Sequence, residues 1–485
     1  MENLHEKTVK GLTWNGLGSV VVQIDRLLAG IILANLLDPK SFGLIAILTI
    51  FVGFGLLFQD LGFGAALVQK KIVTDIQNSS IFWINISIGL ILTTFGHFSG
   101  FFLAKLFDQE ELSQLMTVLS FTFLINSIAI IPLSILKRSV DFKKIAQVTV
   151  ISSLFSSISA ITLAYWGYGV WALVIRALVN SIFSTILYFV VVKWLPKPRF
   201  SWKDVKPFIK FGLNYSGAGI FNYFSRKVDD IAIGKFLGSE ALGLYSRGYS
   251  FLMIPVVSVR NEIIKVMFPI LSTKQDDKIV LKTKFLSMVK VIAFLCFPIL
   301  FGGIATSEFF VEGFLGESWL GMVNIMKIMC VCGLVEVLNI GEVVFMATGQ
   351  TGLLLRISIF TRVIFILLIL AGVFLGIDYV ALAVLIGTLI NFLVNFKYLQ
   401  ESIDLSSVHF FNAIKQVLVI SIAMYIALVT ASHYLAQLKF SPLINFFILF
   451  LLGGAFWISA ILKYRPYPSE YIISKFLYYK SKVRI

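Results

Sequence analysis

Apolar segments long enough to cross a membrane recur along the whole chain. A run of about 18 or more apolar residues spans the hydrocarbon core as a helix, which satisfies its own backbone polar groups there. Only 14% of the 485 residues are charged, whereas soluble proteins carry roughly 25%. Too few charges remain to cover several soluble domains. The sequence therefore predicts an all-α integral membrane protein and excludes a secreted enzyme, a nucleic-acid-binding protein and a disordered chain.

Hydropathy predicts about fourteen transmembrane helices, with ends placed to within several residues. They are expected near 12–37, 42–68, 81–106, 115–136, 146–166, 169–192, 208–235, 242–271, 286–311, 321–347, 354–376, 379–400, 412–435 and 441–462.

The lysines and arginines predict how the helices are oriented. With the N-terminus in the cytoplasm, the inner segments hold most of the basic residues, and the outer segments hold only Lys40, Lys105, Lys235 and Lys439. Cytoplasmic loops of membrane proteins carry such an excess. We therefore expect both termini in the cytoplasm. The net charge of +15 is then explained by attraction to an anionic inner leaflet, without nucleic acid.

The two halves of the chain resemble each other. A shift of about 200 residues places Arg26 on Arg226 and Gly43-Leu44 on Gly243-Leu244. Both copies start on the same side of the membrane, so the repeat is parallel. The sequence predicts two six-helix bundles plus two C-terminal helices. The expected divisions are an N-terminal lobe at 1–195, an interfacial linker at 196–207, a C-terminal lobe at 208–400, helices 13 and 14 at 401–465 and a basic amphipathic tail at 466–485.

Charged residues inside the predicted spans are the candidate functional residues, because a charge at membrane depth is costly. Guanidinium groups bind phosphate oxygens through paired hydrogen bonds. The candidates for an anion-binding cavity that holds a pyrophosphate are Arg26, Arg226, Arg247, Arg176, Lys227 and Lys327. The candidates for proton or sodium coupling are Asp25, Asp60, Asp229, Asp230 and Glu336. The alternative is that these charges form ion pairs that hold helices together.

Motifs of enzyme chemistry are missing. The chain has no Gly-x-x-x-x-Gly-Lys phosphate loop, so no built-in ATPase is expected. The histidines are scattered, and the cysteines lie in apolar stretches where they are expected to pack as small apolar residues. These residues are His5, His97, His409, His433, Cys296, Cys330 and Cys332. We expect no catalytic residues, no metal and no cofactor.

A series of short motifs follows in order over about residues 10–400. The first half contains Leu37-x-Pro39-x-x-Phe42-Gly43-Leu44, Asp60-Leu61-Gly62-Phe63-Gly64, Phe82-Trp83-Ile84-Asn85, Lys137-Arg138-x-x-Asp141-Phe142-Lys143-Lys144 and Gly167-x-Gly169-Val170-Trp171. The second half contains Ile233-Gly234-Lys235-Phe236-Leu237-Gly238, Leu242-Gly243-Leu244-Tyr245, Phe268-Pro269, Leu315-Gly316-Glu317-x-Trp319 and Ala347-Thr348-Gly349. In this combination the chain resembles the Wzx-type flippases of the polysaccharide transporter family, within the multidrug/oligosaccharidyl-lipid/polysaccharide exporter superfamily. It is most similar to the colanic-acid and teichuronic-acid type.

This resemblance implies two six-helix lobes around a central cavity, which opens to each side of the membrane in turn. It implies that undecaprenyl-diphosphate-linked oligosaccharide moves to the external leaflet of the bacterial inner membrane, for polysaccharide or lipopolysaccharide export. Expected partners are this substrate and the bilayer, with a polysaccharide polymerase and a chain-length regulator as further candidates, and no nucleic acid. Two alternatives remain: an ion-coupled small-molecule or multidrug exporter of the same superfamily, and a membrane glycosyl polymerase.

Overall fold

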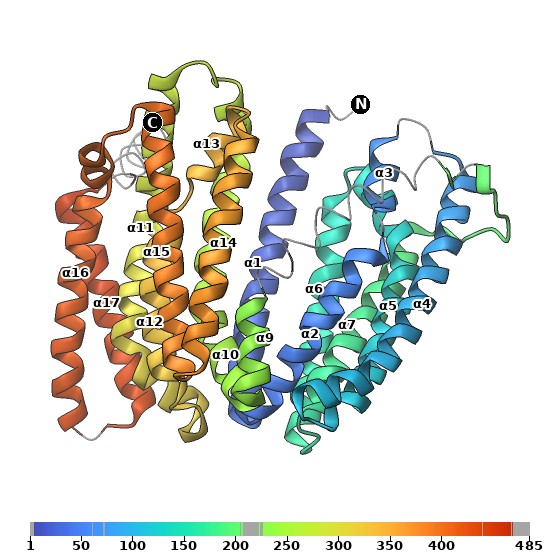
Figure 1. Cartoon of the computed structure of the whole chain (residues 1–485), viewed down its shortest axis with the longest axis horizontal. Coiled ribbons are helices and arrows are strands. Elements are labelled where there is room, and N and C mark those ends of the chain that lie inside the picture. The colour runs from blue at the N-terminus through green and yellow to red at the C-terminus, as the bar shows by residue number, and fades with distance from the viewer. Residues whose placement is uncertain are drawn as a thin grey trace, which may run out of the picture. The chain divides into compact units, whose positions relative to one another are not determined.

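The computed structural model describes residues 4–60, 62–70, 73–203, 205–206, 223, 227–438, 440–466 and 468. Every regular element within these residues is a helix (Figure 1). Packing divides the chain into two compact units, Met1–Gly243 and Leu244–Ile485.

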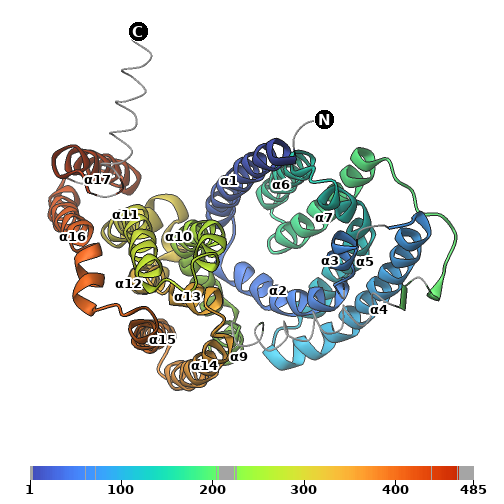
Figure 2. The same ribbon diagram turned by 90° about the horizontal axis from the view of Figure 1, so that it is seen from above.

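The first unit is built from long helices joined by short turns. Its helices are α1 (Leu4–Leu36), α2 (Pro39–Gln59), α3 (Phe63–Gln69), α4 (Asp75–Phe107), α5 (Glu111–Arg138), α6 (Phe142–Tyr165), α7 (Trp171–Val192), α9 (Val228–Phe236) and the first turn of α10 (Gly238–Ser272). Polar side chains begin several of them: Asp38 accepts a hydrogen bond from the Ser41 amide ahead of α2, and Thr74 and Gln77 form a reciprocal capping box on α4. Helix α6 contacts both α1 and α7 (Figure 2).

Helices α4 and α5 show how this unit packs without large side chains. Three glycines of α4, Gly89, Gly96 and Gly100, lie against three serines of α5. These serines are Ser127, Ser120 and Ser113, one every two turns. A Cβ on any of the glycines would come within 2.8 Å of the facing serine. Small residues at such contacts let helix backbones approach closely in a membrane.

The opposite face of α4 carries large apolar side chains. Ile91, Phe95, Phe98 and Phe102 are each more than 60% exposed and follow one another at helical spacing. Their position on one stripe is typical of a surface that faces lipid.

The predicted span 42–68 is not one continuous helix. Helix α2 ends at Gln59, and α3 starts after Gly62, whose φ of 70° is in the left-handed region. The Asp60 carboxylate accepts a hydrogen bond from the Gly64 amide at 2.8 Å and so caps α3. Hydropathy cannot detect this break, because the residues on both sides remain apolar.

The N-termini of α2 and α10 meet in a reciprocal contact of two glycines. A Cβ on Gly43 would lie 1.6 Å from the carbonyl oxygen of Ser239, and a Cβ on Gly243 would lie 1.8 Å from the carbonyl oxygen of Pro39. The four residues are two pairs separated by the same 200 positions that relate the sequence repeats. Only glycine fits at either position.

Part of the segment predicted as an interfacial linker, 196–207, lies within the described residues. The Lys197 and Ser201 amides donate hydrogen bonds to Ser79 and Ser80 at the start of α4, and the buried Val205 packs with Phe63.

The sequence predicts that the second lobe begins at residue 208, whereas packing assigns residues as far as Gly243 to the first unit, because α9 lies against α2 and α4. The predicted tail at 466–485 lies almost wholly outside the described residues.

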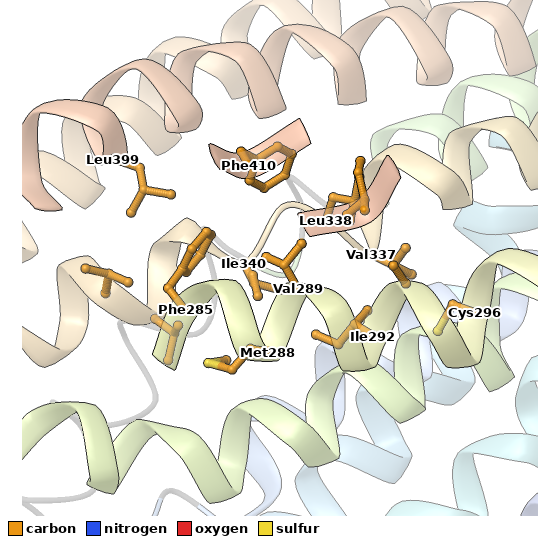
Figure 3. Close-up of a cluster of buried hydrophobic side chains, with 14 of the residues drawn as sticks. Phe285, Met288, Val289, Ile292, Cys296, Val337, Leu338, Ile340, Leu399 and Phe410 are labelled. Atoms are coloured by element: carbon orange, nitrogen blue, oxygen red, sulfur yellow. The ribbon is translucent and has the colours of Figure 1, made fainter. Parts of the chain in front are cut away.

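The second unit has its core around α11. Its helices are the rest of α10, α11 (Lys278–Phe310), a π turn (Val311–Leu315), a 3₁₀ turn (Glu317–Trp319), α12 (Met322–Glu336), α13 (Gly341–Ala347), α14 (Thr351–Val373), α15 (Ile377–Ile403), α16 (Ser407–Gln437) and α17 (Pro442–Tyr464). Figure 3 shows Phe285, Ile292 and Cys296 of α11 in a buried cluster with Leu399 of α15 and Phe410 of α16.

Twelve helical segments within the described residues are long and apolar enough to cross a membrane. Two of the fourteen predicted spans are not among them. The span 208–235 lies largely outside the described residues. The span 242–271 is helical, as part of α10, but it contains Arg247, Arg260, Glu262 and Lys265, which lower its hydropathy. The span 321–347 is also interrupted, between α12 and α13.

Candidate functional site

A buried carboxylate in the middle of α1 organises the first polar cluster. Asp25 lies near the centre of the candidate span Gly16–Leu36 and is 8% exposed. Its Oδ2 atom accepts hydrogen bonds from the hydroxyls of Ser153 and, at 2.9 Å, Ser157, both on α6. Because α6 packs directly on α1, these hydroxyls supply the partners that a buried carboxylate requires.

Two guanidinium groups accompany this carboxylate. Arg176 of α7 donates a hydrogen bond to the Ser157 hydroxyl at 3.0 Å, so a chain of contacts joins α7, α6 and α1. The positive charge of Arg176 is attracted by the negative charge of Asp25 and repelled by the positive charge of Arg26. Arg26 is exposed and makes no hydrogen bond or ion pair within the described part of the chain.

This cluster carries one more positive than negative charge. The cluster contains Arg26 and Arg176 but a single carboxylate, Asp25, whose hydrogen bonds are to serines rather than to arginine. An arginine at membrane depth faces the bundle interior or a water-filled space rather than lipid. Chemically the arrangement suits a phosphate group, since Arg26 offers a full set of guanidinium donors while the Ser157 hydroxyl accepts a hydrogen bond from Arg176.

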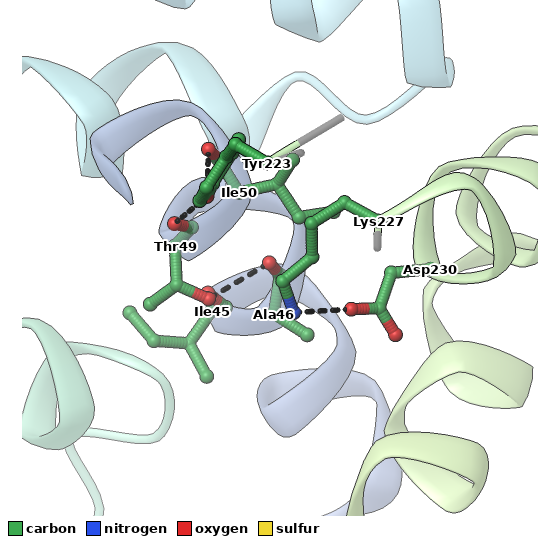
Figure 4. A network of polar contacts seen from close by, with 7 residues as sticks. All are labelled: Ile45, Ala46, Thr49, Ile50, Tyr223, Lys227 and Asp230. Carbon is green, nitrogen blue, oxygen red and sulfur yellow. Dashed lines mark hydrogen bonds and ion pairs between the residues drawn. The ribbon is translucent and has the colours of Figure 1, made fainter. Parts of the chain in front are cut away.

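The charges near α9 form a separate group within the same unit. The Tyr223 hydroxyl donates to the Ile50 carbonyl oxygen of α2 at 2.6 Å, and Lys227 forms an ion pair with Asp230 at 2.6 Å (Figure 4). A Cβ on Gly53 would come within 2.2 Å of the Tyr223 hydroxyl. For Lys227 and Asp230 the structure therefore shows the ion pair that the sequence left as an alternative. Arg226, the repeat partner of Arg26, lies outside the described residues.

The second unit contains a partly buried ion pair at the interruption between α12 and α13. Arg260 of α10 pairs with Glu336 at 2.7 Å, and its second terminal nitrogen donates to the Asn339 carbonyl oxygen at 2.8 Å. The side chains of Arg260 and Glu336 are 11% and 29% exposed. Arg260 thus satisfies a carbonyl that the broken helix leaves without its usual partner. Arg260 was not among the sequence candidates, since its partners lie more than seventy positions away along the chain.

The remaining candidates lie apart from these clusters. Asp60 caps α3, and Lys327 is 3.9 Å from Glu308 with both side chains well exposed. Arg247 and Asp229 each have further contacts in the structure. The three cysteines are buried free thiols, and no group of three metal-ligating side chains occurs in the described part of the chain.

We expect Glu336 to act as the partner of Arg260 in a double-mutant cycle. Replacing Arg260 with methionine leaves the partly buried Glu336 carboxylate uncompensated, which lowers the free energy of unfolding by up to about 3 kcal/mol. Replacing Glu336 with glutamine in the same chain should recover most of this loss. The check is the thermal unfolding temperature of the purified single and double variants. Additive losses in the double variant would instead show that the two side chains act independently and leave Glu336 open as an ion-coupling residue.

Comparison with known proteins identifies relatives over most of the chain. The model of a family described as "Polysaccharide biosynthesis protein" matches residues 32–324. The chain is 27% identical over 428 residues to "Teichuronic acid biosynthesis protein TuaB" of Bacillus subtilis (strain 168), covering 87% of this chain and 89% of that protein. It is 24% identical over 400 residues to "Lipopolysaccharide biosynthesis protein WzxC" of Escherichia coli (strain K12), covering 81% of each.

Solved structures show the same fold. "Lipid II flippase MurJ, inward closed conformation" superimposes with a TM-score of 0.70 at 17% identity, covering 93% of this chain and 98% of that chain. At this identity the likeness establishes the fold alone. The all-helical transporter fold predicted from the sequence is confirmed, and the family match confirms the predicted resemblance.

Proposed function

Because the chain belongs to the family of polysaccharide biosynthesis proteins, we propose that it is a flippase for a lipid-linked oligosaccharide. The substrate is a polyprenyl diphosphate that carries a repeat unit, moved from the cytoplasmic to the external leaflet of a bacterial inner membrane. Its relatives are described as proteins of teichuronic acid, lipopolysaccharide and succinoglycan biosynthesis, the last as a transport protein. The fold is that of a lipid II flippase.

The observation that carries the proposal is the positive surplus of the Asp25–Arg26–Arg176 cluster at membrane depth. A phosphorylated head group must cross the hydrocarbon core, where its charge is costly to bury. Guanidinium groups stay charged when buried and can replace the water lost by phosphate oxygens. The lipid tail remains in the bilayer throughout, so only the head group needs a polar path.

Alternating access between the two sides would move this head group without ATP. Transport energy then comes from an ion gradient, the membrane potential or consumption of the product outside. Asp25, Asp60, Asp229, Asp230 and Glu336 stay candidates for coupling to an ion. Both termini lie in the cytoplasm in this proposal, as the distribution of lysines and arginines supports. A polymerase and a chain-length regulator would act on the product at the external face.

Two other functions are weaker. An ion-coupled small-molecule or multidrug exporter would rely on a few lone carboxylates, whereas the α1–α6–α7 cluster has a basic surplus. A membrane glycosyl polymerase acts after the lipid-linked unit has crossed the membrane. In a strain without this protein, lipid-linked repeat units should therefore accumulate on the cytoplasmic face if it is a flippase and on the external face if it is a polymerase.

Deleting the gene should trap lipid-linked repeat units on the cytoplasmic face. The measurement is the fraction of these units that an impermeant sugar oxidant reaches in intact cells, compared with cells that express the intact chain. We expect the accessible fraction to fall to background while the total amount of lipid-linked unit rises. Accumulation of accessible, unpolymerised units would overturn the proposal and favour a polymerase.

A further inference from the structure

The segment that follows α7 is fastened across the start of α4. It is described at residues 194–203 and 205–206, and we call it the strap. The Lys197 amide donates a hydrogen bond to the Ser79 hydroxyl at 3.0 Å, and the Lys197 carbonyl oxygen accepts one from the Trp83 indole nitrogen at 3.0 Å. The strap therefore has a fixed place on the first unit.

One part of the strap is buried and another part is exposed. Val205 is fully buried in a cluster with Phe63 of α3 and Phe82 of α4. Phe200 and Trp202 are instead each more than half exposed, and their ring centroids lie 6.3 Å apart. Aromatic rings at the surface of a membrane protein are typical of the boundary between lipid and water.

The strap carries more positive than negative charge. Its basic residues are Lys197, Arg199, Lys203 and Lys206. Its one acidic residue is Asp204, and Lys197 also forms an ion pair with Asp75 at 2.9 Å. Counting both carboxylates against the four basic residues leaves a surplus of two positive charges. This surplus favours a negatively charged lipid surface as the partner.

The length of α7 places the strap at the depth of lipid head groups. Tyr165, Trp166 and Tyr168 before this helix are each more than half exposed, as are Phe200 and Trp202 after it. Helix α7 has 22 residues and is about 33 Å long, close to the roughly 30 Å of hydrocarbon in a bilayer. The two aromatic groups thus have the spacing of the two membrane interfaces.

The strap also continues the surface of α7 that faces lipid. Ile182, Ile186 and Val190 are exposed and recur every four residues, so they form an apolar stripe along this helix. Leu195, which follows in the strap, is exposed as well. An apolar stripe that leads to exposed aromatic and basic side chains is the pattern of a segment that lies in the interface.

We propose that the strap binds the surface of an anionic lipid leaflet on the side where α4 begins. The rings of Phe200 and Trp202 enter the head-group region, and Lys203 and Lys206 lie beside the lipid phosphates. In the orientation proposed above, this is the cytoplasmic leaflet. The binding does not depend on which substrate the chain transports.

The first test measures the depth of the strap in the full-length chain, reconstituted in lipid vesicles. A spin label on Phe200→Cys is compared with labels on Phe98→Cys, on the lipid-facing side of α4, and Gln275→Cys, in the exposed turn after α10. The native cysteines are buried, and the chain without an added cysteine gives the background. The measurement is the ratio of collisions with oxygen, which concentrates in lipid, to collisions with a water-soluble nickel complex.

We expect the ratio at position 200 to lie between the other two and clearly above the ratio at position 275. A label at position 200 that meets the nickel complex as often as the label at position 275 would overturn the proposal.

The second test compares vesicles of phosphatidylcholine with vesicles that also contain phosphatidylglycerol. Phosphatidylglycerol should raise the proportion of immersed label at position 200. Lys203→Gln/Lys206→Gln should then lower the ratio of immersed to water-exposed label about twentyfold, because each basic residue near an anionic surface contributes about a factor of five. Lys203→Arg/Lys206→Arg should keep the ratio, since both charges remain.

The matched control is Lys274→Gln/Lys284→Gln, which removes two exposed lysines of the second unit. The ratio at position 200 should stay within about twofold, since exposed charges outside the strap are screened by salt. Equal losses in the two glutamine variants would overturn the site in favour of general surface attraction. An immersed label that responds neither to phosphatidylglycerol nor to the loss of Lys203 and Lys206 would overturn the binding of anionic lipid.

Discussion

Replacing Arg26 and Arg176 together with glutamine is expected to slow oligosaccharide translocation by at least about a hundredfold. A hydrogen bond to a charged group contributes about 1.5–3 kcal/mol, and the double variant removes both guanidinium groups of the cluster. The measurement is the initial rate at which a fluorescent lipid-linked oligosaccharide reaches the outer leaflet of proteoliposomes. Arg26→Lys should retain part of the rate, since lysine keeps the charge but loses the paired hydrogen-bond geometry.

The matched control is Arg356→Gln, which removes an exposed arginine of α14 away from the cluster. It should transport at the unaltered rate. Protein yield and unfolding temperature are measured for every variant, because Arg176 also holds α7 to α6 through Ser157. If Arg26→Gln, Arg176→Gln and the double variant all transport at the unaltered rate, the cluster does not contact the substrate during transport.

Replacing Gly43 with alanine is expected to prevent the chain from folding correctly. The added Cβ would lie 1.6 Å from the Ser239 carbonyl oxygen, a backbone atom that cannot rotate aside. Forcing an added atom into a packed contact typically costs about 1–3 kcal/mol, and a clash with a fixed backbone atom lies at the upper end of this range, which is a large part of the stability of most proteins. The measurement is the fraction of detergent-extracted protein that runs as a single monodisperse species. Gly243→Ala should fail in the same way, because its Cβ would meet the Pro39 carbonyl oxygen at 1.8 Å.

Gly352→Ala provides the control for these two changes. Gly352 is helical, and no atom lies within 4 Å of its expected Cβ. Alanine should therefore leave the protein as stable as before, or slightly more so, because alanine favours helices by up to about 1 kcal/mol over glycine. A Gly43→Ala protein with unchanged yield and unfolding temperature would show that the two helix starts can separate without cost.

The membrane helices could be predicted from the sequence because hydropathy is a local property. The repeat was visible for a similar reason, since the arginine and the Gly-Leu pair keep one offset along the chain. Hydropathy does not predict the helix breaks within the spans 42–68 and 321–347, because polar groups there replace the helical hydrogen bonds. Asp60 caps α3 through its side chain, and Arg260 donates to the Asn339 carbonyl oxygen.

The pairing of charges could not be predicted, because it is decided by tertiary contacts. Sequence singled out Asp25, Arg26 and Arg176 as separate intramembrane charges. It could not show that Asp25 and Arg176 would be joined through the hydroxyl of Ser157 on α6 rather than by a direct contact. Nor could it distinguish them from Lys227 and Asp230, where a local spacing of three residues produces a direct ion pair.

The reciprocal glycine contact has the form of a local twofold interface. Gly43 lies against Ser239 and Gly243 against Pro39, so the two short segments present equivalent positions to each other. Contacts of this isologous kind are how identical subunits form closed homodimers. The starts of α2 and α10 are related in the same reciprocal way, so a side chain added at either glycine meets a backbone carbonyl oxygen of the other segment.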